Sequence, residues 1–324
     1  MKKSALILSY HFYPSAEIGA RRPSELALSL QRAGWQVTAV AAKSRRRIRT
    51  DPALEPKAES LQVIRVTDPP SLEAFLVRWI KKMLGRDSGG SGKPELSEPA
   101  PHTEPTKASP GRRLWRTCKR YYFSIRHLFG HNKAWSTLVF FRLIPVVWTG
   151  RYQLIVSSGP PMPSHIVALA ASKLFGSRLV LDFRDPWFLA EFAPFQYRSK
   201  LRDRLDFWME QVCYRNADLI VCTSPGAARQ ISARCPEASS KTRIVFNGYD
   251  ARPGTANEIP TGQLRLLYAG AIYFNRNPFP LFEALQALVR DPSLQRSKIR
   301  IDLYGHCAEW QGIQIQPWLE ERNL

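Results

Sequence analysis

The 324-residue sequence is poor in acidic side chains and has no closely spaced cysteine pair. It contains 27 Asp and Glu against 47 Lys and Arg, so its formal net charge is +20 at pH 7. This excess points to an anionic partner: a phosphorylated substrate, an anionic lipid or a nucleic acid. Without any CxxC spacing, the cysteines argue against a zinc site and favour reduced thiols in the cytoplasm. The five cysteines are Cys118, Cys213, Cys222, Cys235 and Cys307.

Two further absences exclude other classes of protein. No run approaches the roughly 20 apolar residues of a membrane span, because LVFFRLIPVVW is short and contains Arg142. No GxGxxG follows the first apolar run, where the sequence reads SYHFYPSAEIGA, so a nicotinamide oxidoreductase is disfavoured. Charge alone would allow a nucleic-acid binder. However, the basic residues lie among bulky apolar groups without a recognisable nucleic-acid module, so we expect no nucleic-acid partner.

Alternating strand and helix patterns open the chain. Short apolar runs predict strands at residues 5–8, 37–40 and 61–66. Between the first two runs, a stripe from Leu26 to Ala33 predicts a helix with Pro23 in its first turn. Strand, helix and strand at this spacing predict a parallel βαβ unit.

A second unit of this kind lies near the middle of the chain. Residues 154–156 and 179–181 read as strands buried on both faces. Between them, Ser164 is expected to cap a helix that ends at Gly176. Ligands bind outside the carboxyl ends of parallel strands, so polar groups after both strands are expected to face one crevice. The second strand delivers three charged groups within four residues: Asp182, Arg184 and Asp185.

The rest of the chain continues the α/β pattern. A helix carrying Leu201, Leu205, Trp208 and Val212 is expected, then a strand at 219–222. After a linker at 249–254, a new α/β unit begins near residue 264. The sequence therefore predicts two domains, residues 1–249 and 250–324.

Residues from about 71 to 134 differ in character from the segments around them. SLEAFLVRWIKKMLGR reads as a basic amphipathic helix, and RRLWRTCKRYYFSIRHLFGHNKAW resumes the same mixture of basic and aromatic residues. Between them lies a Gly-, Ser-, Pro- and Glu-rich segment that is expected to be disordered. One reading is two helices in peripheral contact with an anionic membrane. The other is a solvated basic face above an ordinary core stripe.

The order of these segments resembles the GT-B glycosyltransferases, most closely glycosyltransferase family 4. The resemblance implies an α/β fold with two Rossmann-like domains that face a cleft, the second incomplete here. It implies that the N-terminal domain binds an acceptor and the C-terminal domain a nucleotide-sugar, with retained anomeric configuration and no bound metal or other cofactor. The matching stretches are ALILSYHFYPSAEIGARRPSELALSLQRAGWQVTAVA, YQLIVSSGPPMPSHIVALAASKLFGSRLVLDFRDPW, ADLIVCTSPGAARQI, RIVFNGYD and LRLLYAGAIYFNRNPFPLFEAL.

The resemblance also implies site residues in the first domain. Gly19 would let the backbone approach a ligand, next to a helix N-terminus that favours anions. Arg21 and Arg22 would pair with phosphate, or would be a solvated helix start. The expected acceptor and phosphate loop comprises Glu17, Gly19, Arg21, Arg22, Ser158 and Gly159.

Arg184 and Asp185 match the place where many family members carry His-Asp. Arginine stays protonated and cannot act as a general base. Asp182 or Asp185 would do that work, or the donor phosphate would assist. The alternative is an Asp–Arg salt bridge that only shapes the loop. His165, at the start of a helix, reads as a local hydrogen-bonding residue rather than a catalyst.

In the second domain, the loop after the strand ending at Gly270 resembles the donor phosphate loop. Arg276 falls where many members place a Lys, whereas Ala271 replaces a second cation. The expected donor-binding residues are Gly270, Asn275, Arg276 and Gly305.

The family's second domain normally continues beyond the point where this chain stops. The chain therefore reads as a truncated or partner-dependent enzyme that transfers a sugar to a lipid-linked or polysaccharide acceptor. Its expected place is the inner face of the membrane, in cell-surface glycan synthesis. The alternative is a non-catalytic protein that binds an acceptor or a membrane.

Overall fold

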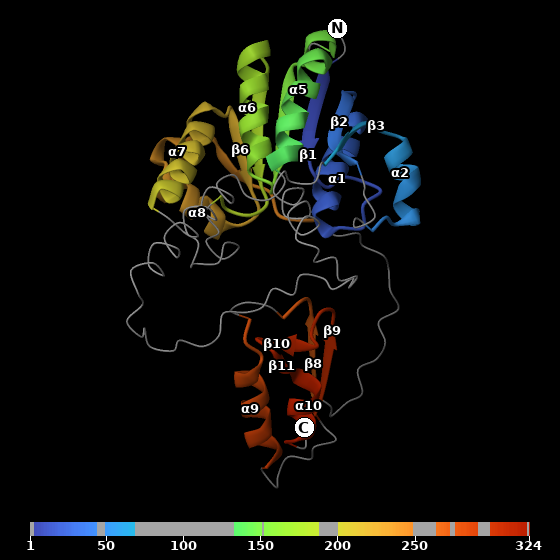
Figure 1. Cartoon of the computed structure of the whole chain (residues 1–324), viewed down its shortest axis with the longest axis vertical. Helices are drawn as coiled ribbons and strands as arrows, with labels where there is room; N and C mark the ends of the chain where they lie inside the picture. The colour runs from blue at the N-terminus through green and yellow to red at the C-terminus, as the bar shows by residue number, and fades with distance from the viewer. Residues whose placement is uncertain are drawn as a thin grey trace, which may run out of the picture. The chain divides into compact units, whose positions relative to one another are not determined.

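The structure is a computed structural model, and its described residues form two compact units. The first extends to residue 248 and the second begins at residue 264 (Figure 1). The described residues are 3–43, 49–68, 133–150, 152–187, 200–248, 264–272, 276–290, 299–322 and 324.

The first unit is built on a seven-stranded parallel sheet. Its strand order is β3-β2-β1-β4-β5-β6-β7, which confirms the predicted α/β class. The register aligns Ala5 with Val37 on one side and with Leu154 on the other. The strands are β1 (Ser4–Ser9), β2 (Gln36–Lys43), β3 (Gln62–Thr67), β4 (Leu154–Gly159), β5 (Arg178–Phe183), β6 (Leu219–Cys222) and β7 (Thr242–Ile244).

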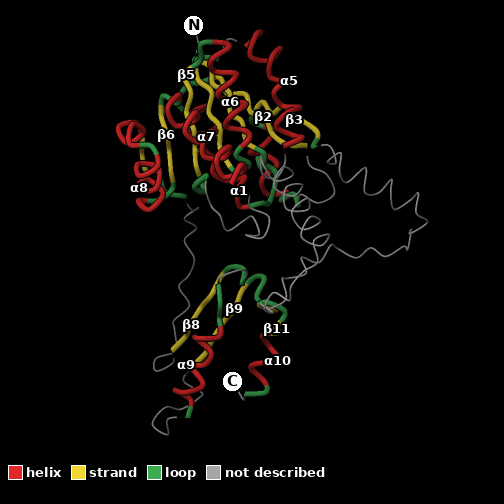
Figure 2. Tube along the Cα trace, turned by 60° about the vertical axis from the view of Figure 1, so that its left-hand side comes forward, coloured by secondary structure: helices red, strands yellow, loops and turns green. Residues whose placement is uncertain are grey.

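Helices cover both faces of this sheet, as Figures 1 and 2 show. Residues from α5, α6, α7 and α8 pack with Leu6, Leu8 and Ile155 in one core. Residues of α1 pack with Ile7 and Val156 in the other. Neighbouring residues of one strand thus enter opposite cores, as the period of a strand requires. The helices are α1 (Ile18–Arg32), α2 (Glu55–Glu59), α5 (Lys133–Gly150), α6 (Pro163–Phe175), α7 (Lys200–Asn216) and α8 (Pro225–Arg234), with short 3-10 turns at Pro52–Leu54 and Pro236–Lys241.

The central strands extend further than the apolar runs predicted. β4 continues through Ser158 to Gly159, and β5 continues through Asp182 to Phe183. Ser158 and Asp182 are register partners and both are buried. Asp182 therefore belongs to the strand, not to the loop after it.

Two predicted helix starts are wrong. α1 begins at Ile18, so Pro23 lies inside the helix and not in its first turn. α6 begins at Pro163, and the Ser164 hydroxyl donates back to the Pro161 carbonyl instead of capping the helix. The predicted end of α6 is confirmed, because Gly176 adopts the left-handed conformation with a φ of 69°.

The predicted stripe of α7 is also only partly right. Leu201 and Trp208 are 55% and 61% exposed, while the helix buries Met209, Cys213 and Tyr214. Its buried side is therefore rotated away from the predicted stripe.

The second unit has a smaller parallel pair, β8 (Leu264–Ala269) and β9 (Ile299–Tyr304) (Figure 2). Phe279, Phe282 and Leu285 of α9 (Phe279–Val289) pack in a core with Ile315. Ile315 opens α10 (Ile315–Glu320), which follows the short antiparallel hairpin of β10 (Glu309–Trp310) and β11 (Ile313–Gln314).

Some predictions fall on residues outside the description. They are the segment from 71 to 132, the linker at 249–254 and Asn275. Within the described residues, no helix is both long and apolar enough to cross a membrane.

Candidate functional site

The carboxyl ends of the parallel strands share one edge of the first unit's sheet. This is the edge at which open α/β sheets bind ligands. The residues that follow β1, β4, β5, β6 and β7 include His11, Pro160, Arg184, Thr223 and Asn247 respectively. Polar groups from the ends of β4, β5, β6 and β7 and from the start of α1 form one hydrogen-bond network.

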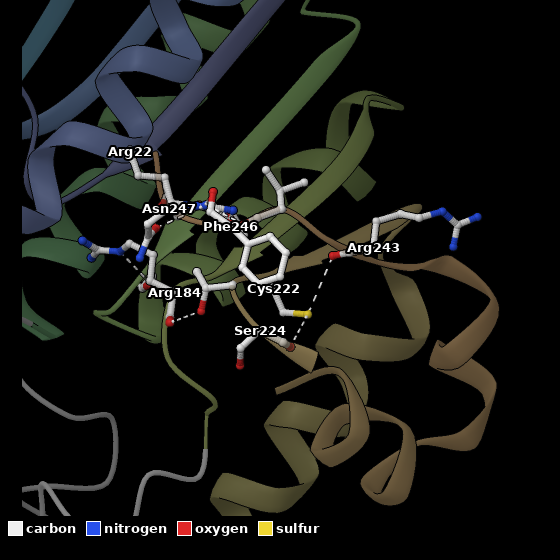
Figure 3. A network of polar contacts seen from close by, with 12 residues as sticks. Arg22, Arg184, Cys222, Ser224, Arg243, Phe246 and Asn247 are labelled. Carbon is white, nitrogen blue, oxygen red and sulfur yellow. Dashed lines mark hydrogen bonds and ion pairs between the residues drawn. The ribbon is translucent and has the colours of Figure 1, made fainter. Parts of the chain in front are cut away.

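Arg184 holds three chain segments together through backbone carbonyls. Its Nε donates to the Gly159 carbonyl at 3.0 Å, and its two Nη atoms donate to Gly19 and Pro160 at 2.6 Å each. The Arg184 carbonyl in turn accepts from the Thr223 hydroxyl at 2.9 Å (Figure 3). One side chain thus braces the ends of β4 and β5 against the first turn of α1.

The sequence explains why Arg184 can reach α1. Pro23 has no N–H, so the helical partner of the Gly19 carbonyl four residues earlier is missing. Arg184 donates to that carbonyl instead. A Cβ at position 19 would lie 2.2 Å from Nη1 of Arg184, so only glycine admits the guanidinium here. The atoms closest to Gly19 therefore belong to a side chain of the protein itself.

Arg22 and Asp182 form a buried ion pair. Arg22 donates to both carboxylate oxygens at 2.8–3.0 Å, and the Ser158 hydroxyl donates to Oδ2 at 2.8 Å. The side chains are only 14% and 4% exposed. With three donor groups around it, Asp182 has the environment of a structural carboxylate, which is the salt-bridge alternative considered from the sequence.

Arg22 also reaches the segment that leaves the sheet. Its Nη1 donates to the Val245 carbonyl at 2.8 Å, and to the Phe246 carbonyl and Asn247 Oδ1 at 3.2 and 3.3 Å (Figure 3). Arg22 therefore ties α1 to β5 and to the residues after β7. The neighbouring predicted residues Glu17 and Arg21 are exposed at the start of α1.

Asp185 differs from Asp182 in its surroundings. It is half-buried, and it makes no hydrogen bond or ion pair with any residue that the structure describes. Burial raises the pKa of its carboxyl above the ordinary value, and the charge of Arg184 partly offsets this. Of the three predicted catalytic residues, Asp185 alone has the environment of an available carboxylate.

Two histidines lie within the field of Arg184. His165 is fully buried, its Nδ1 is 3.0 Å from Ser157 Oγ, and burial together with Arg184 lowers its pKa to about 3. Its Nε2 has no hydrogen-bond partner among the described residues, and its ring lies 4.4 Å from that of Phe183. It is thus a neutral residue of the core, beneath the network.

His11 is a candidate that the sequence interpretation missed. It follows β1 by two residues and is half-buried, and its buried Nδ1 has no hydrogen-bond partner within the described part of the chain. Burial and then Arg184 lower its pKa, while Glu17 raises it. The sequence signal that could have identified His11 is its place in SYHFYP, directly after a predicted strand. His11 differs from His165 because it lies at the ligand-binding edge of the sheet and is only half-buried, so its Nδ1 can meet a ligand there.

The predicted donor residues lie in the second unit. The Gly270 N–H donates to the Tyr304 carbonyl, so the ends of β8 and β9 lie close together. Gly305 has a φ of +115°, and a Cβ there would lie 2.0 Å from the Gly270 carbonyl, so both features require glycine. Arg276 donates to the Ala271 carbonyl at 3.4 Å.

The described ranges contain no candidate metal site. There, no three His, Cys, Asp or Glu side chains are grouped so that they could hold an ion.

Comparisons with known proteins extend this description. The glycosyl transferase 4-like domain family matches residues 19–248, more than two thirds of the chain. No curated protein sequence gave a match. Among solved structures, the sucrose-phosphate synthase of Thermosynechococcus elongatus matches with a TM-score of 0.50 at 16% identity. That match covers 100% of this chain and 68% of the other.

Two more solved structures are similar at lower scores. Anabaena HepE in complex with UDP-glucose matches at 13% identity and a TM-score of 0.44, over 99% of this chain. The chain spans 64% of that structure, less than two thirds of its length. The lipopolysaccharide outer core galactosyltransferase WaaB matches at 12% identity and 0.46, over 98% of this chain and 71% of the other. These neighbours have the GT-B fold. By its matching domain, the chain belongs to the glycosyl transferase 4-like family of glycosyltransferases.

Proposed function

We propose that this chain takes part in the transfer of a sugar from a nucleotide-sugar to a lipid-linked or polysaccharide acceptor in cell-surface glycan synthesis. The first unit would bind the acceptor, and the second would contribute to holding the donor through the loop after Gly270. Family membership supports the reaction class. The observation that carries the acceptor site is Asp185, a half-buried carboxylate without a described partner at the shared edge of the sheet.

The proposed reaction replaces one bond at the anomeric carbon. The bond from that carbon to the donor phosphate oxygen breaks, and its electron pair leaves with the nucleoside diphosphate. The acceptor hydroxyl oxygen forms the new bond from the same face, so the configuration is retained. Its proton passes to Asp185 or to the departing phosphate. A raised pKa suits Asp185 to accept a proton near neutrality better than an ordinary, solvated carboxylate would.

The test compares wild type with Asp185→Asn. Membranes from cells that express either protein receive radiolabelled nucleotide-sugars one at a time, and labelled lipid or polymer is counted. Loss of a general base typically costs about 10²–10⁴-fold in rate, so we expect at least a hundredfold less product from the variant. Its unfolding midpoint should not fall, because an amide is cheaper to bury than a carboxylate. Equal labelling would remove Asp185 from the mechanism.

A second candidate function is non-catalytic binding of the acceptor. It is favoured by the internal contacts of Arg184 and Asp182, which leave only one of the three predicted catalytic groups available. In that case Asp185→Asn would weaken acceptor binding, and neither protein would incorporate label above the level of membranes without the chain.

A further inference from the structure

Helix α5 packs against the sheet through one side. Trp135, Val139 and Leu143 recur every four residues and are at most 1% exposed. This stripe explains why the helix docks on the sheet next to α6 (Figure 1). A surface helix of this kind normally presents polar and charged residues on its opposite side.

The opposite side of α5 is apolar instead. Phe141 and Trp148 are 63% and 74% exposed, and they lie seven residues apart, which places them two turns apart on one line. Leu138 and Ile144 flank them, also exposed. We name Leu138, Phe141, Ile144 and Trp148 the α5 stripe. Exposed apolar groups that line up in this way mark an interaction surface more often than single exposed residues do.

The sequence that contains the α5 stripe carries charge of one sign. The 76 residues from Thr106 to Leu181 contain no Asp or Glu, but they contain 12 Lys and Arg. One of these, Arg142, is exposed on α5 itself. The Trp148 ring contacts the ring of Phe175 on α6 edge to face. Leu174, which precedes Phe175, is also exposed. Aromatic side chains favour the headgroup region of a bilayer. Neighbouring Lys and Arg side chains, with no Asp or Glu among them, are attracted to anionic lipids.

We propose that the α5 stripe inserts into the headgroup region of an anionic membrane, with α5 lying along the surface. Such membrane insertion would not depend on sugar transfer. A second copy of the chain is disfavoured as the occupant, because pairing through this face would bring two acid-free, basic stretches together. An anionic lipid surface brings the opposite charge to the same face and buries the aromatic rings.

The test is co-sedimentation of the full chain with vesicles of phosphatidylcholine alone or with one quarter phosphatidylglycerol. Phe141→Ser combined with Trp148→Ser removes the centre of the α5 stripe without changing charge. Leu201→Ser combined with Trp208→Ser is the matched control, since these α7 residues are also seven apart and 55% and 61% exposed. α7 carries acidic residues, which the α5 stripe lacks.

Wild type and the α7 variant should bind the anionic vesicles equally. The α5 variant should bind at least about tenfold more weakly, because two large side chains no longer leave water. The contrary result is that all three proteins bind equally and that salt abolishes the binding of each. That result would mean adsorption through charge alone and would overturn insertion. A change from dimer to monomer in the α5 variant, with unchanged vesicle binding, would assign the stripe to a second copy. Loss of cooperative unfolding would show that the chain's own residues cover it.

Discussion

At the scale of single residues, His165 shows how far burial changes chemistry. Its ring is sealed beneath the sheet edge, and its pKa is lowered to about 3, whereas an unfolded chain has an ordinary histidine with a pKa near 6.5. At pH values between about 3 and 6.5, His165 is protonated in the unfolded state but not in the folded state. The stability of the protein should therefore fall as the pH falls below about 6.5.

This dependence can be measured by urea unfolding at pH values from 7.5 to 5. One histidine contributes a slope of at most about 1.4 kcal/mol per pH unit below pH 6.5. His11 adds a contribution of the same sign, because its pKa is also lowered. His165→Gln should flatten the slope by close to one proton, whatever its effect on stability at pH 7.5. Parallel curves for wild type and variant would mean that His165 is not buried as described.

The pair of Arg22 and Asp182 is the other residue-scale feature with a clear energetic consequence. Removing one partner leaves an uncompensated charge in a nearly dry site, which typically costs about 3–5 kcal/mol. Asp182→Asn should therefore lower the free energy of unfolding by an amount of this order. The exposed pair of Arg215 and Glu237 is the matched control, and Glu237→Gln should cost less than about 1 kcal/mol. Similar losses in both variants would argue against a buried pair.

At the scale of elements, the junction of α1 with the sheet depends on a glycine. A methyl group at position 19 would collide with the Arg184 guanidinium, which three carbonyls hold in place. Gly19→Ala should displace Arg184 and leave the part-buried carbonyls of Gly19 and Gly159 without this donor, at a cost of about 1–3 kcal/mol. Gly226→Ala on α8 meets nothing closer than 3.8 Å and should be neutral or slightly stabilising. Thermal unfolding distinguishes the two variants, and equal midpoints would contradict the contact.

The elements also show what the sequence could and could not predict. The central strands β1 and β4 were predictable because each carries a continuous apolar run buried on both faces, as Ile155 and Val156 show. Their ends were not, since Ser158 and Asp182 read as loop residues until the partner of each is known. The start of α1 was missed because Pro23 is tolerated inside the helix, where Arg184 takes over the carbonyl that it leaves free.

Site residues were predictable to a similar degree. The two strand ends that were expected to meet do lie together, because parallel strands place their carboxyl ends at one edge. The states of Arg22 and Arg184 depend on partners 160 or more positions away, Asp182 for the first and Gly19 for the second. No local pattern distinguishes the paired Asp182 from Asp185, or signals that His11 has a nitrogen without a partner.

At the scale of the whole molecule, the two units have different tasks in the proposed reaction. The first carries the network of Arg22, Arg184 and Asp182, which fixes the sheet edge where Asp185 lies. In this proposal the second would contribute Gly270, Gly305 and Arg276, and a nucleotide-sugar would bind there. The proposed reaction depends on donor binding by this chain.

The most direct measurement is thermal unfolding of the 324-residue chain with a panel of nucleotide-sugars and free nucleotides. A ligand that binds only the folded state at a hundredfold excess over its Kd stabilises by about 2.7 kcal/mol. We predict a higher midpoint with one nucleotide class, and a smaller shift in Arg276→Gln than in Arg300→Gln, because Arg300 pairs with Asp302 on its own strand β9. A cooperative transition that no nucleotide moves would contradict donor binding by this chain.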